Sequence, residues 1–393
     1  MRDNPTPERL SPRAILETLV AFPTVSRDTN LPLIDWVDDY LASHGIESHR
    51  HWHEDGTKAA LFAHVGPKIS GGVVLSGHTD VVPVDGQAWD TDPFVVIEKD
   101  GRLYGRGTCD MKGFDALAIW ALVEAHYAEV ERPLQLALSY DEEVGCTGAP
   151  PMIEAMQGVL PKASAVIVGE PSTMQAVTGH KGGLGWMTHL HGFEVHSSIL
   201  HTGVSAVMNA GPLLVWANAQ NAAGQASEPN PLAVDFEPHW STWHVGQIEG
   251  GTAHNITAKD CEFAMSVRLV PGDDAGVLEE AYRAAVVGVE AGMKAIRPET
   301  GITLTPFFNV PPLVPEPEGE AEGIVRRITG DNAIHVVSYA TEAGQFQEAG
   351  YSAVVCGPGD IAQAHQPNEF IEISQFQAGQ DFLARLIDLL KGD

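Results

Sequence analysis

Short apolar runs separated by a helical stretch constrain the fold of this chain more than any other feature of its sequence. Three such runs lie in its first half, at residues 72–76, 134–139 and 165–168, and each is bounded by polar residues or glycine. A helical stretch at about residues 113–130 separates the first two. Alternation of strands and helices predicts a largely parallel sheet covered by helices. The expected fold class is therefore α/β.

The middle of the chain has a different order of elements. Strands and helices are expected there in the order β-α-β-β-α, at residues 182–191, 204–222, 240–248, 261–269 and 275–295. That order favours a small α+β domain of the ferredoxin-like type with an antiparallel sheet.

The expected domain bounds follow from the position at which the β–α alternation of the first half resumes. After Pro298, a strand at residues 302–306 and a proline-rich link lead back to β–α alternation. We therefore expect a discontinuous α/β domain at residues 1–181 and 297–393, mainly a parallel sheet flanked by helices. The α+β domain at residues 182–296 would interrupt it. A length of 393 residues is consistent with two domains, at ~150 residues per domain.

The charge balance excludes several classes of protein. Asp+Glu 52 outnumber Lys+Arg 23, which leaves a formal net charge of −29 at pH 7. A chain this acidic repels nucleic-acid phosphates and anionic membrane surfaces, so we expect no nucleic-acid partner and no membrane partner. Hydrophobic residues make up 44% of the chain and charged residues only 19%, which excludes a disordered acidic tail.

Cysteine usage and apolar runs indicate where the protein works. The longest apolar stretch, residues 114–127, is interrupted by polar side chains and falls short of the ~18 uninterrupted apolar residues of a spanning helix. Residues 1–10 contain no apolar region of the kind found in signal peptides. The four cysteines lie far apart and form no CxxC pair, so we expect free thiols in a reducing cytoplasm.

A histidine and an aspartate end the first apolar run. His78 follows the expected strand, and Asp80 lies two positions on, hence on the same face if the strand continues. A carboxylate there could hold one imidazole nitrogen and leave the other free for a metal. The alternative is an ordinary polar strand end.

Other polar clusters follow the same plan, and each has a structural alternative. Asp110 lies in a glycine-rich stretch, residues 105–113, just before an expected helix, where aspartate also acts as an N-cap. Three adjacent acids at residues 141–143 end a strand and repel each other unless something positive lies nearby. A solvated acidic turn is their alternative. Glu170 follows another strand, and His365 lies in a loop, where a surface histidine is the alternative.

Together these clusters favour a metal site. Ligands of open α/β sheets bind outside the carboxyl ends of the strands. Such positions are expected for His78, Asp110, Glu142, Glu143 and Glu170. Two histidines and several carboxylates are consistent with a two-metal site that has one bridging carboxylate. Nitrogen and oxygen ligands without cysteine suit Zn²⁺, with Co²⁺ or Mn²⁺ as substitutes.

Six motifs in the chain match those of a known family in the same order. The sequence resembles the acetylornithine deacetylase / succinyl-diaminopimelate desuccinylase / aminoacylase family of co-catalytic zinc amidohydrolases and peptidases, over essentially its whole length. The motifs are SGHTDVVP (76–83), GRGTCDMKG (105–113), SYDEEVGCTG (139–148), GEPS (169–172), EVHSS (194–198) and AHQPNE (364–369). No single motif is specific for this family, but the six motifs together are.

The resemblance implies a metal-binding role for five residues and two Zn²⁺ per subunit. His78 and Glu170 look like the terminal ligands of one zinc. Glu143 and His365 look like those of the other, and Asp110 matches the bridging carboxylate. Members of the family often have a cis peptide bond after this aspartate.

Two further carboxylates have catalytic roles by the same resemblance. Asp80 matches the residue that orients the first histidine. Glu142 matches the general base, which takes a proton from a metal-bridging water. The hydroxide that results attacks the amide carbonyl, and Glu142 returns the proton to the leaving amine.

The resemblance implies that the inserted domain is a lid and a dimerisation domain. His196 would be donated by the partner subunit to the tetrahedral oxyanion, which makes a homodimer necessary for activity. Asn255 and Arg268 match positions that hold the substrate, and the guanidinium of Arg268 would suit an α-carboxylate. An ion pair on the sheet surface is the alternative for Arg268.

Within the family, residues 341–344 and 356–359 look most like the acetylornithine deacetylase branch. This implies hydrolysis of N-acetyl-L-ornithine to L-ornithine and acetate in arginine biosynthesis, and Glu342 could help to hold a substrate amine. One alternative is a succinyl-diaminopimelate desuccinylase or another N-acyl-amino-acid deacylase or metallopeptidase of the family. The other is a metal-binding protein without turnover. Glu142 and His196 argue against the latter, since neither is needed merely to hold metal.

Overall fold

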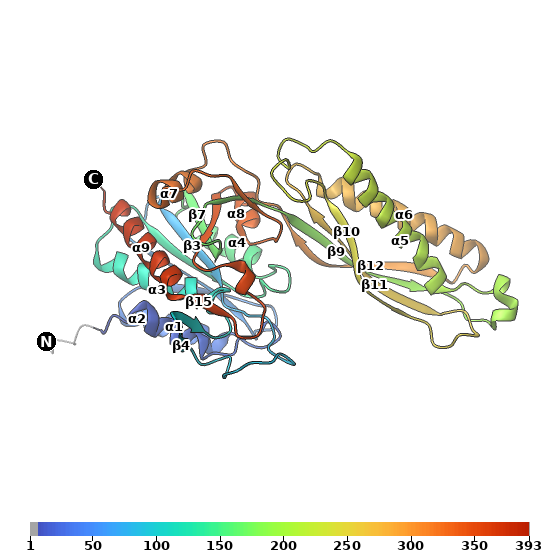
Figure 1. Ribbon diagram of the computed structural model, residues 1–393, viewed down its shortest axis with the longest axis horizontal. Helices are drawn as coiled ribbons and strands as arrows, with labels where there is room; N and C mark the ends of the chain where they lie inside the picture. The colour runs from blue at the N-terminus through green and yellow to red at the C-terminus, as the bar shows by residue number, and fades with distance from the viewer. Residues whose placement is uncertain (1–6, 393) are drawn as a thin grey trace. The chain divides into compact units, whose positions relative to one another are not determined.

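The computed structural model describes residues 7–392, which divide into two compact units (Figure 1). Unit 1 contains the chain up to Gly179, Pro315–Val336 and the chain from Thr341 onward. Unit 2 contains His180–Val314 and Val337–Ala340. Within the described residues, no helix combines the length and the apolar character needed to cross a bilayer.

An eight-stranded sheet forms the centre of unit 1. Across the sheet its strands are β1 (Ser48–Trp52), β2 (Ala59–Val65), β6 (Leu134–Ser139), β3 (Val73–His78), β7 (Ala165–Pro171), β14 (Ser352–Gly357), β8 (Val177–His180) and β13 (His335–Val337). The neighbours β6, β3, β7 and β14 are parallel, whereas β1 and β2 add antiparallel pairs at one edge. The carboxyl ends of the parallel strands therefore lie at one edge of the sheet.

Helices pack on both faces of this sheet. One buried core joins the sheet to α1 (Pro12–Val20), α2 (Leu31–Ser43), α3 (Lys112–Tyr127), α7 (Glu320–Thr329) and α9 (Ile373–Leu390). The helices α4 (Ala149–Val159) and α8 (Ala343–Glu348) take no part in that core and contact β2, β6, β7 and β14. Because both faces are covered, β3, β6 and β7 are buried at every position. The predicted α/β class is confirmed.

A small three-stranded sheet brings two distant segments of unit 1 together. Its strands are β4 (Ile97–Lys99), β5 (Arg102–Tyr104) and β15 (Phe370–Glu372), in the order β15-β5-β4. The register pairs Phe370 with Tyr104 and Glu372 with Arg102. The chain that follows His365 is thereby held beside the chain that precedes Asp110.

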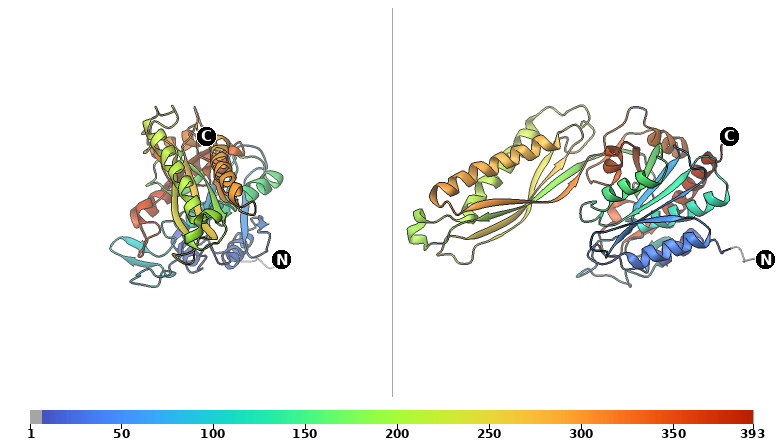
Figure 2. Two further views of the ribbon diagram at one scale, coloured as in Figure 1. Left: turned by 90° about the vertical axis from the view of Figure 1, so that its right-hand side faces the viewer. Right: turned by 180° about the vertical axis from the view of Figure 1, so that it is seen from behind.

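Unit 2 is an antiparallel sheet with two helices. Its strands lie in the order β10 (Thr242–Gly250), β11 (Asp260–Leu269), β9 (Gly182–His191) and β12 (Gly301–Val310). The long helices α5 (Ala206–Ala226) and α6 (Ala275–Ile296) lie side by side against this sheet, as Figures 1 and 2 show. With chain order β-α-β-β-α-β, this is the predicted ferredoxin-like arrangement.

The position of β12 corrects one expected domain bound. The strand expected at residues 302–306 was placed in the α/β domain, but β12 pairs with β9 from Gly301↔His191 to Val310↔Gly183. Unit 2 therefore extends to Val314 and not only to residue 296. The sequence hides this because β12 is an edge strand that is largely exposed and lacks a regular apolar alternation. Its register shifts next to Pro306, a residue that sheets tolerate at edges and bulges.

A buried tyrosine organises the core of unit 2. Tyr282 on α6 is fully buried and packs against Trp186, Trp216 and Trp243. Its hydroxyl lies 2.6 Å from Oγ1 of Thr188, which is also fully buried. Each hydroxyl therefore satisfies the other inside an otherwise apolar core.

We predict that this pair of hydroxyls is energetically coupled. Tyr282→Phe should lower the free energy of unfolding by about 1–2 kcal/mol, because it leaves a buried hydroxyl without its partner. Thr188→Val should cost a similar amount, and the double variant should cost less than the sum. Urea unfolding followed by tryptophan fluorescence measures all three. Strictly additive losses would show that the two hydroxyls do not stabilise each other.

Candidate metal centre

The metal ligands expected from the sequence converge at the carboxyl edge of the parallel strands. His78 ends β3, Glu143 lies in the turn after β6, and Glu170 lies near the end of β7. Asp110 lies just before α3, and His365 lies after the short helix η2 (Ile361–Gln363). Because β6, β3 and β7 are neighbours in the sheet, residues that follow each strand lie close together.

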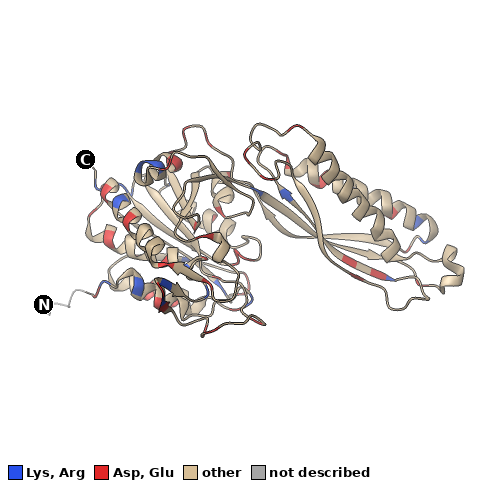
Figure 3. Cartoon of the chain, viewed as in Figure 1, with Lys and Arg blue, Asp and Glu red and all other residues tan. Residues whose placement is uncertain are grey.

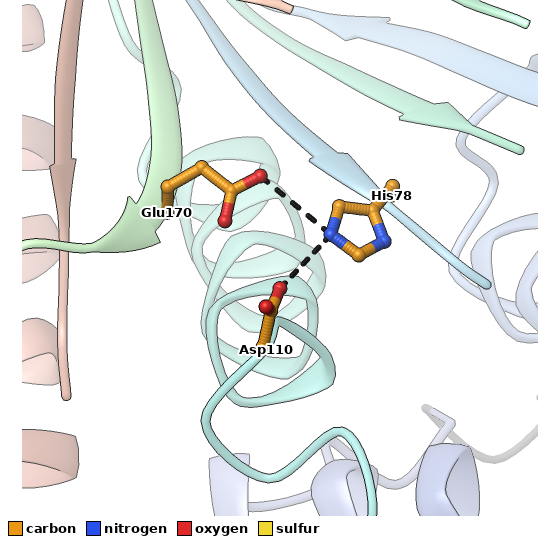
Figure 4. A group of neighbouring side chains, drawn as sticks. All are labelled: His78, Asp110 and Glu170. Carbon is orange, nitrogen blue, oxygen red and sulfur yellow. Dashed lines mark hydrogen bonds and ion pairs between the residues drawn. The ribbon is translucent and has the colours of Figure 1, made fainter. Parts of the chain in front are cut away.

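Three side chains form the first group (Figure 4). The Nε2 atom of His78 lies 3.1 Å from Oδ1 of Asp110 and 3.6 Å from Oε1 of Glu170. In Figure 4 both carboxylates point toward this nitrogen, one from the end of β7 and the other from the segment before α3. All three residues are buried. The peptide bond between Asp110 and Met111 is cis, as the resemblance implies.

A second group shares Asp110 with the first. The Nε2 atom of His365 lies 3.0 Å from Oε2 of Glu143 and 3.3 Å from Oδ2 of Asp110. Within each group the candidate ligand atoms all lie within 4.8 Å of one another. Asp110 thus turns one carboxylate oxygen toward each histidine. This is the arrangement that a bridging carboxylate between two metal ions requires.

The electrostatics of the site favour added positive charge. Burial raises the pKa of Glu142 to about 8. The charges of Glu143 and Asp110 also raise this pKa, whereas the charge of His78 lowers it. Burial and the charge of Asp110 raise the pKa of Glu143 to about 7, although His365 opposes the shift. One oxygen of Glu143, Oε1, is buried and has no hydrogen-bond partner among residues 7–392. A donor set of histidine and carboxylate groups with an unpartnered buried oxygen fits divalent cations.

Asp80 lies directly behind the first group. The Nδ1 atom of His78 lies 2.9 Å from the backbone oxygen of Asp80 and 3.6 Å from its carboxylate, so the carbonyl is the closer acceptor. The carboxylate itself accepts hydrogen bonds from the backbone nitrogens of Glu142, at 3.2 Å, and Glu143, at 3.3 Å. The hydroxyl of Ser26 also donates to it, at 2.7 Å. Asp80 therefore positions the turn after β6 as well as the histidine.

A buried ion pair connects the segment before Asp110 to the loop of His365. The Nη1 atom of Arg106 lies 2.7 Å from Oε2 of Glu369, and both side chains are 1% exposed. The other oxygen of Glu369 accepts hydrogen bonds from the backbone nitrogens of Cys109 and Asp110, at 2.9 and 3.0 Å. Glu369 thus connects the loop of His365 to the backbone of the shared ligand. Arg106 and Glu369 both lie in motifs of the family, but their spacing along the chain does not show that the two side chains form an ion pair.

Glu342 is another carboxylate beneath the site. It is 1% exposed, and it accepts hydrogen bonds from the hydroxyls of Ser139 and Ser76. Burial raises its pKa to about 7, although the Ser139 hydrogen bond lowers it. Its carboxylate is therefore held by side chains at the ends of β3 and β6.

The three candidate residues of unit 2 lie at two different ends of its sheet. His196 and Asn255 are neighbours, since an isolated bridge pairs His196 with Ile256 and the backbone nitrogen of Ser197 donates to the oxygen of Asn255 at 2.8 Å. Both are exposed. Arg268 lies on β11 opposite Gly183, at the start of β9, whereas His196 lies beyond the end of β9. Arg268 is also exposed.

A mainly parallel sheet with two carboxylate–histidine groups at its carboxyl edge is typical of metal-dependent hydrolases. The model of Peptidase family M20/M25/M40 matches residues 74–389. The chain is 36% identical to acetylornithine deacetylase of Myxococcus xanthus over 387 residues, 95% of this chain and 96% of that protein. The chain therefore belongs to the M20/M25/M40 family and is a hydrolase that acts on amide bonds. The resemblance seen in the sequence is confirmed.

Solved structures show the same fold at low sequence identity. An M20 family metallo-carboxypeptidase from Sulfolobus solfataricus superposes with a TM-score of 0.77 and 18% identity, over 97% of this chain and 99% of that one. A dinuclear metal binding peptidase of the M20 family from Bacillus subtilis gives a TM-score of 0.62 at 14% identity, over 96% and 97%. These likenesses support the fold described above.

We predict that the two groups hold metal ions through one shared ligand. Asp110→Asn should remove most metal from both positions, because this residue belongs to both groups. His365→Ala should reduce the content from about two ions per subunit to about one. His189→Ala, a half-exposed histidine of unit 2 outside both groups, serves as the control. Equilibrium dialysis against Zn²⁺ followed by metal analysis gives the stoichiometry. Full occupancy in Asp110→Asn would contradict the shared-ligand assignment.

Proposed function

We propose that this protein hydrolyses the amide bond of an N-acyl amino acid, with N-acetyl-L-ornithine converted to L-ornithine and acetate as the preferred reaction. The observation that carries the proposal is Asp110 shared between two carboxylate–histidine groups, with the carboxylate of Glu142 beside them. The named relative supports the substrate, because it is an acetylornithine deacetylase that matches nearly the whole chain.

The proposed cofactor is a pair of Zn²⁺ ions, with Co²⁺ or Mn²⁺ as substitutes. The donor set contains imidazole nitrogens and carboxylate oxygens but no thiolate, a mixture that these metals accept. His78 and Glu170 would hold one ion, Glu143 and His365 the other, and Asp110 both. When bound, the metal pair would acidify the attacking water and polarise the amide carbonyl.

Glu142 is the proposed proton carrier. It belongs to neither ligand group, and its Oε2 atom lies 4.0 Å from Nε2 of His78. It would take the proton of the attacking water and give it to the leaving nitrogen. Its backbone is fixed by the hydrogen bond to Asp80, so the carboxylate starts from a defined place.

The substrate would be held by groups of unit 2 from two subunits. Arg268 would pair with the α-carboxylate, Asn255 would contact the substrate, and His196 would donate a hydrogen bond to the developing oxyanion. The eight residue steps from Gly183 to His191 span about 26 Å at ~3.3 Å per residue, more than the length of an acyl amino acid. This span favours a site in which Arg268 and His196 come from different copies of unit 2. We therefore propose that the partner subunit supplies His196.

The surface of unit 2 supports a homodimer. Helix α5 contains no charged residue over Ala206–Ala226, and Figure 3 draws this helix in tan without blue or red segments. Its exposed side chains include Val207, Met208 and Val215, which are 42%, 65% and 68% exposed. An apolar, uncharged helix face suits association with a second copy.

We place this activity in the cytoplasm. All four cysteines are free thiols in the structure, and all are buried. Free thiols are typical of proteins that work in a reducing compartment.

A substrate panel tests the proposed reaction. The wild-type protein should show a higher kcat/KM for N-acetyl-L-ornithine than for succinyl-diaminopimelate or other N-acyl amino acids. Glu142→Gln should bind both metals but lose about 10²–10⁴-fold in kcat, because the proton carrier is gone. Metal analysis of the same sample shows that the loss is not a loss of metal. A clear preference for another acyl amino acid would contradict N-acetyl-L-ornithine as the substrate. An active Glu142→Gln would contradict the role of Glu142 as the base.

Subunit mixing tests the donation of His196 across the dimer. His196→Ala and Glu142→Gln dimers should each be inactive, whereas their mixture should recover about a quarter of wild-type activity. Half of the dimers would then be mixed, and each mixed dimer would contain one complete site. Differently tagged chains verify that subunits have exchanged. No recovery after proven exchange would show that His196 acts within its own subunit.

A further inference from the structure

The turn after β6 contains a cysteine whose thiol contacts the proposed base. Sγ of Cys146 lies 3.1 Å from Oε1 of Glu142 and donates a hydrogen bond to it. Cys146 is 3% exposed, so the contact lies inside the protein. It is outside both ligand groups, and the mechanism above gives it no role.

We propose that Cys146 is a positioning residue that fixes the carboxylate of Glu142, an inference that rests on the proposed role of Glu142 as the base. The thiol holds Oε1, whereas Oε2 faces the first ligand group, 4.0 Å from Nε2 of His78. The two oxygens therefore have different tasks. Oε1 is the anchored atom, and Oε2 is the atom that receives and returns the proton.

The backbone of the turn holds the thiol in place. The nitrogens of Gly145 and Cys146 both donate to the backbone oxygen of Glu142, at 2.9 Å. The backbone oxygen of Cys146 accepts a hydrogen bond from Nε2 of the buried Gln345 at 3.0 Å. The cysteine is thus clamped between the residue that it positions and helix α8.

The backbone conformation of Cys146 favours a chemical role for its side chain over a role in packing. Its φ angle is +54°, in the left-handed region that favours glycine and carries strain for other residues. Glycine would suit the backbone better at this position but would remove the hydrogen bond. A side chain here therefore opposes the backbone preference, which fits a task performed by the thiol.

The thiol remains a donor in this environment. Burial and then the charges of Glu142 and Glu342 raise the pKa of Cys146 well above its ordinary value. A protonated thiol donates its hydrogen and does not compete as an anion with the carboxylates around it. It is a weak donor, so it orients Glu142 without neutralising it.

Three substitutions of Cys146 test the proposal. Cys146→Gly and Cys146→Ala should each lower kcat about ten-fold, with KM changed less than about two-fold, because substrate binding is untouched. Cys146→Ser keeps a hydrogen-bond donor and should stay within about three-fold of wild type. Cys146→Gly should also be at least as stable as Cys146→Ala in urea unfolding, because glycine relieves the strained backbone and neither variant has the thiol. A residue needed only for packing would lose stability and activity together.

The controls separate this contact from general effects of losing a thiol. Cys261→Ala removes a buried free cysteine from unit 2 and should leave kcat unchanged. Metal content should equal that of wild type in every variant, as measured by metal analysis. If Cys146→Gly or Cys146→Ala turns over at the wild-type rate, or if Cys146→Ser is as slow as Cys146→Ala, the proposal is overturned.

A double variant distinguishes failure of this inference from failure of the base assignment. Adding Cys146→Ala to Glu142→Gln should change the residual rate less than about two-fold, because the group to be positioned is already disabled. An inactive Glu142→Gln beside fully active Cys146 variants would refute the positioning role alone. An active Glu142→Gln would refute the base, whatever the Cys146 variants show.

Discussion

Repulsion among buried carboxylates is the constraint on which the rest of the site depends. Asp110, Glu142, Glu143 and Glu170 lie together at one edge of the sheet of unit 1, and burial penalises their charged forms. Such a cluster is tolerated only where positive charge or fixed hydrogen-bond donors offset it. The two histidines, and the divalent cations that we propose, provide that charge. Because Asp110 is shared, the site contains two groups that each present a nitrogen and two carboxylates, and Glu142 belongs to neither group.

The surrounding structure holds these repelling groups in place. Asp80 fixes the backbone of Glu142 and Glu143 while its carbonyl accepts from His78. Glu369, paired with the buried Arg106, fixes the backbone of Asp110. The hydrogen bonds of Glu142 and Glu143 to Asp80, and those of Asp110 and Arg106 to Glu369, join segments that are distant in the chain. The geometry of the site therefore depends on the packing of unit 1 as a whole, and on the small sheet that places β15 beside β5.

Much of the fold was predictable because its strands are short apolar runs with polar ends. The five residues of the two candidate ligand groups could be named from the sequence, since each follows a predicted strand or lies in a motif of the family. β12 was assigned to the wrong unit, because an exposed edge strand with Pro306 lacks the alternation that marks a half-buried strand. Arg106 and Glu369 lay within motifs, yet nothing in their spacing indicates that they form an ion pair. The contact between Cys146 and Glu142 required the left-handed turn, which a sequence pattern does not reveal.

The sequence by itself determined the class of the fold, the chemical types of the candidate ligands and the surplus of acidic residues. These properties are local, because strand periodicity and residue identity are written along the chain. Only the tertiary structure decided which oxygen of Asp110 faces which histidine, and which oxygen of Glu142 accepts the hydrogen bond of Cys146. It also placed Arg268 and His196 at opposite ends of one sheet. Those properties depend on the register of the strands and on contacts between residues far apart in sequence, so they arise only when the chain packs.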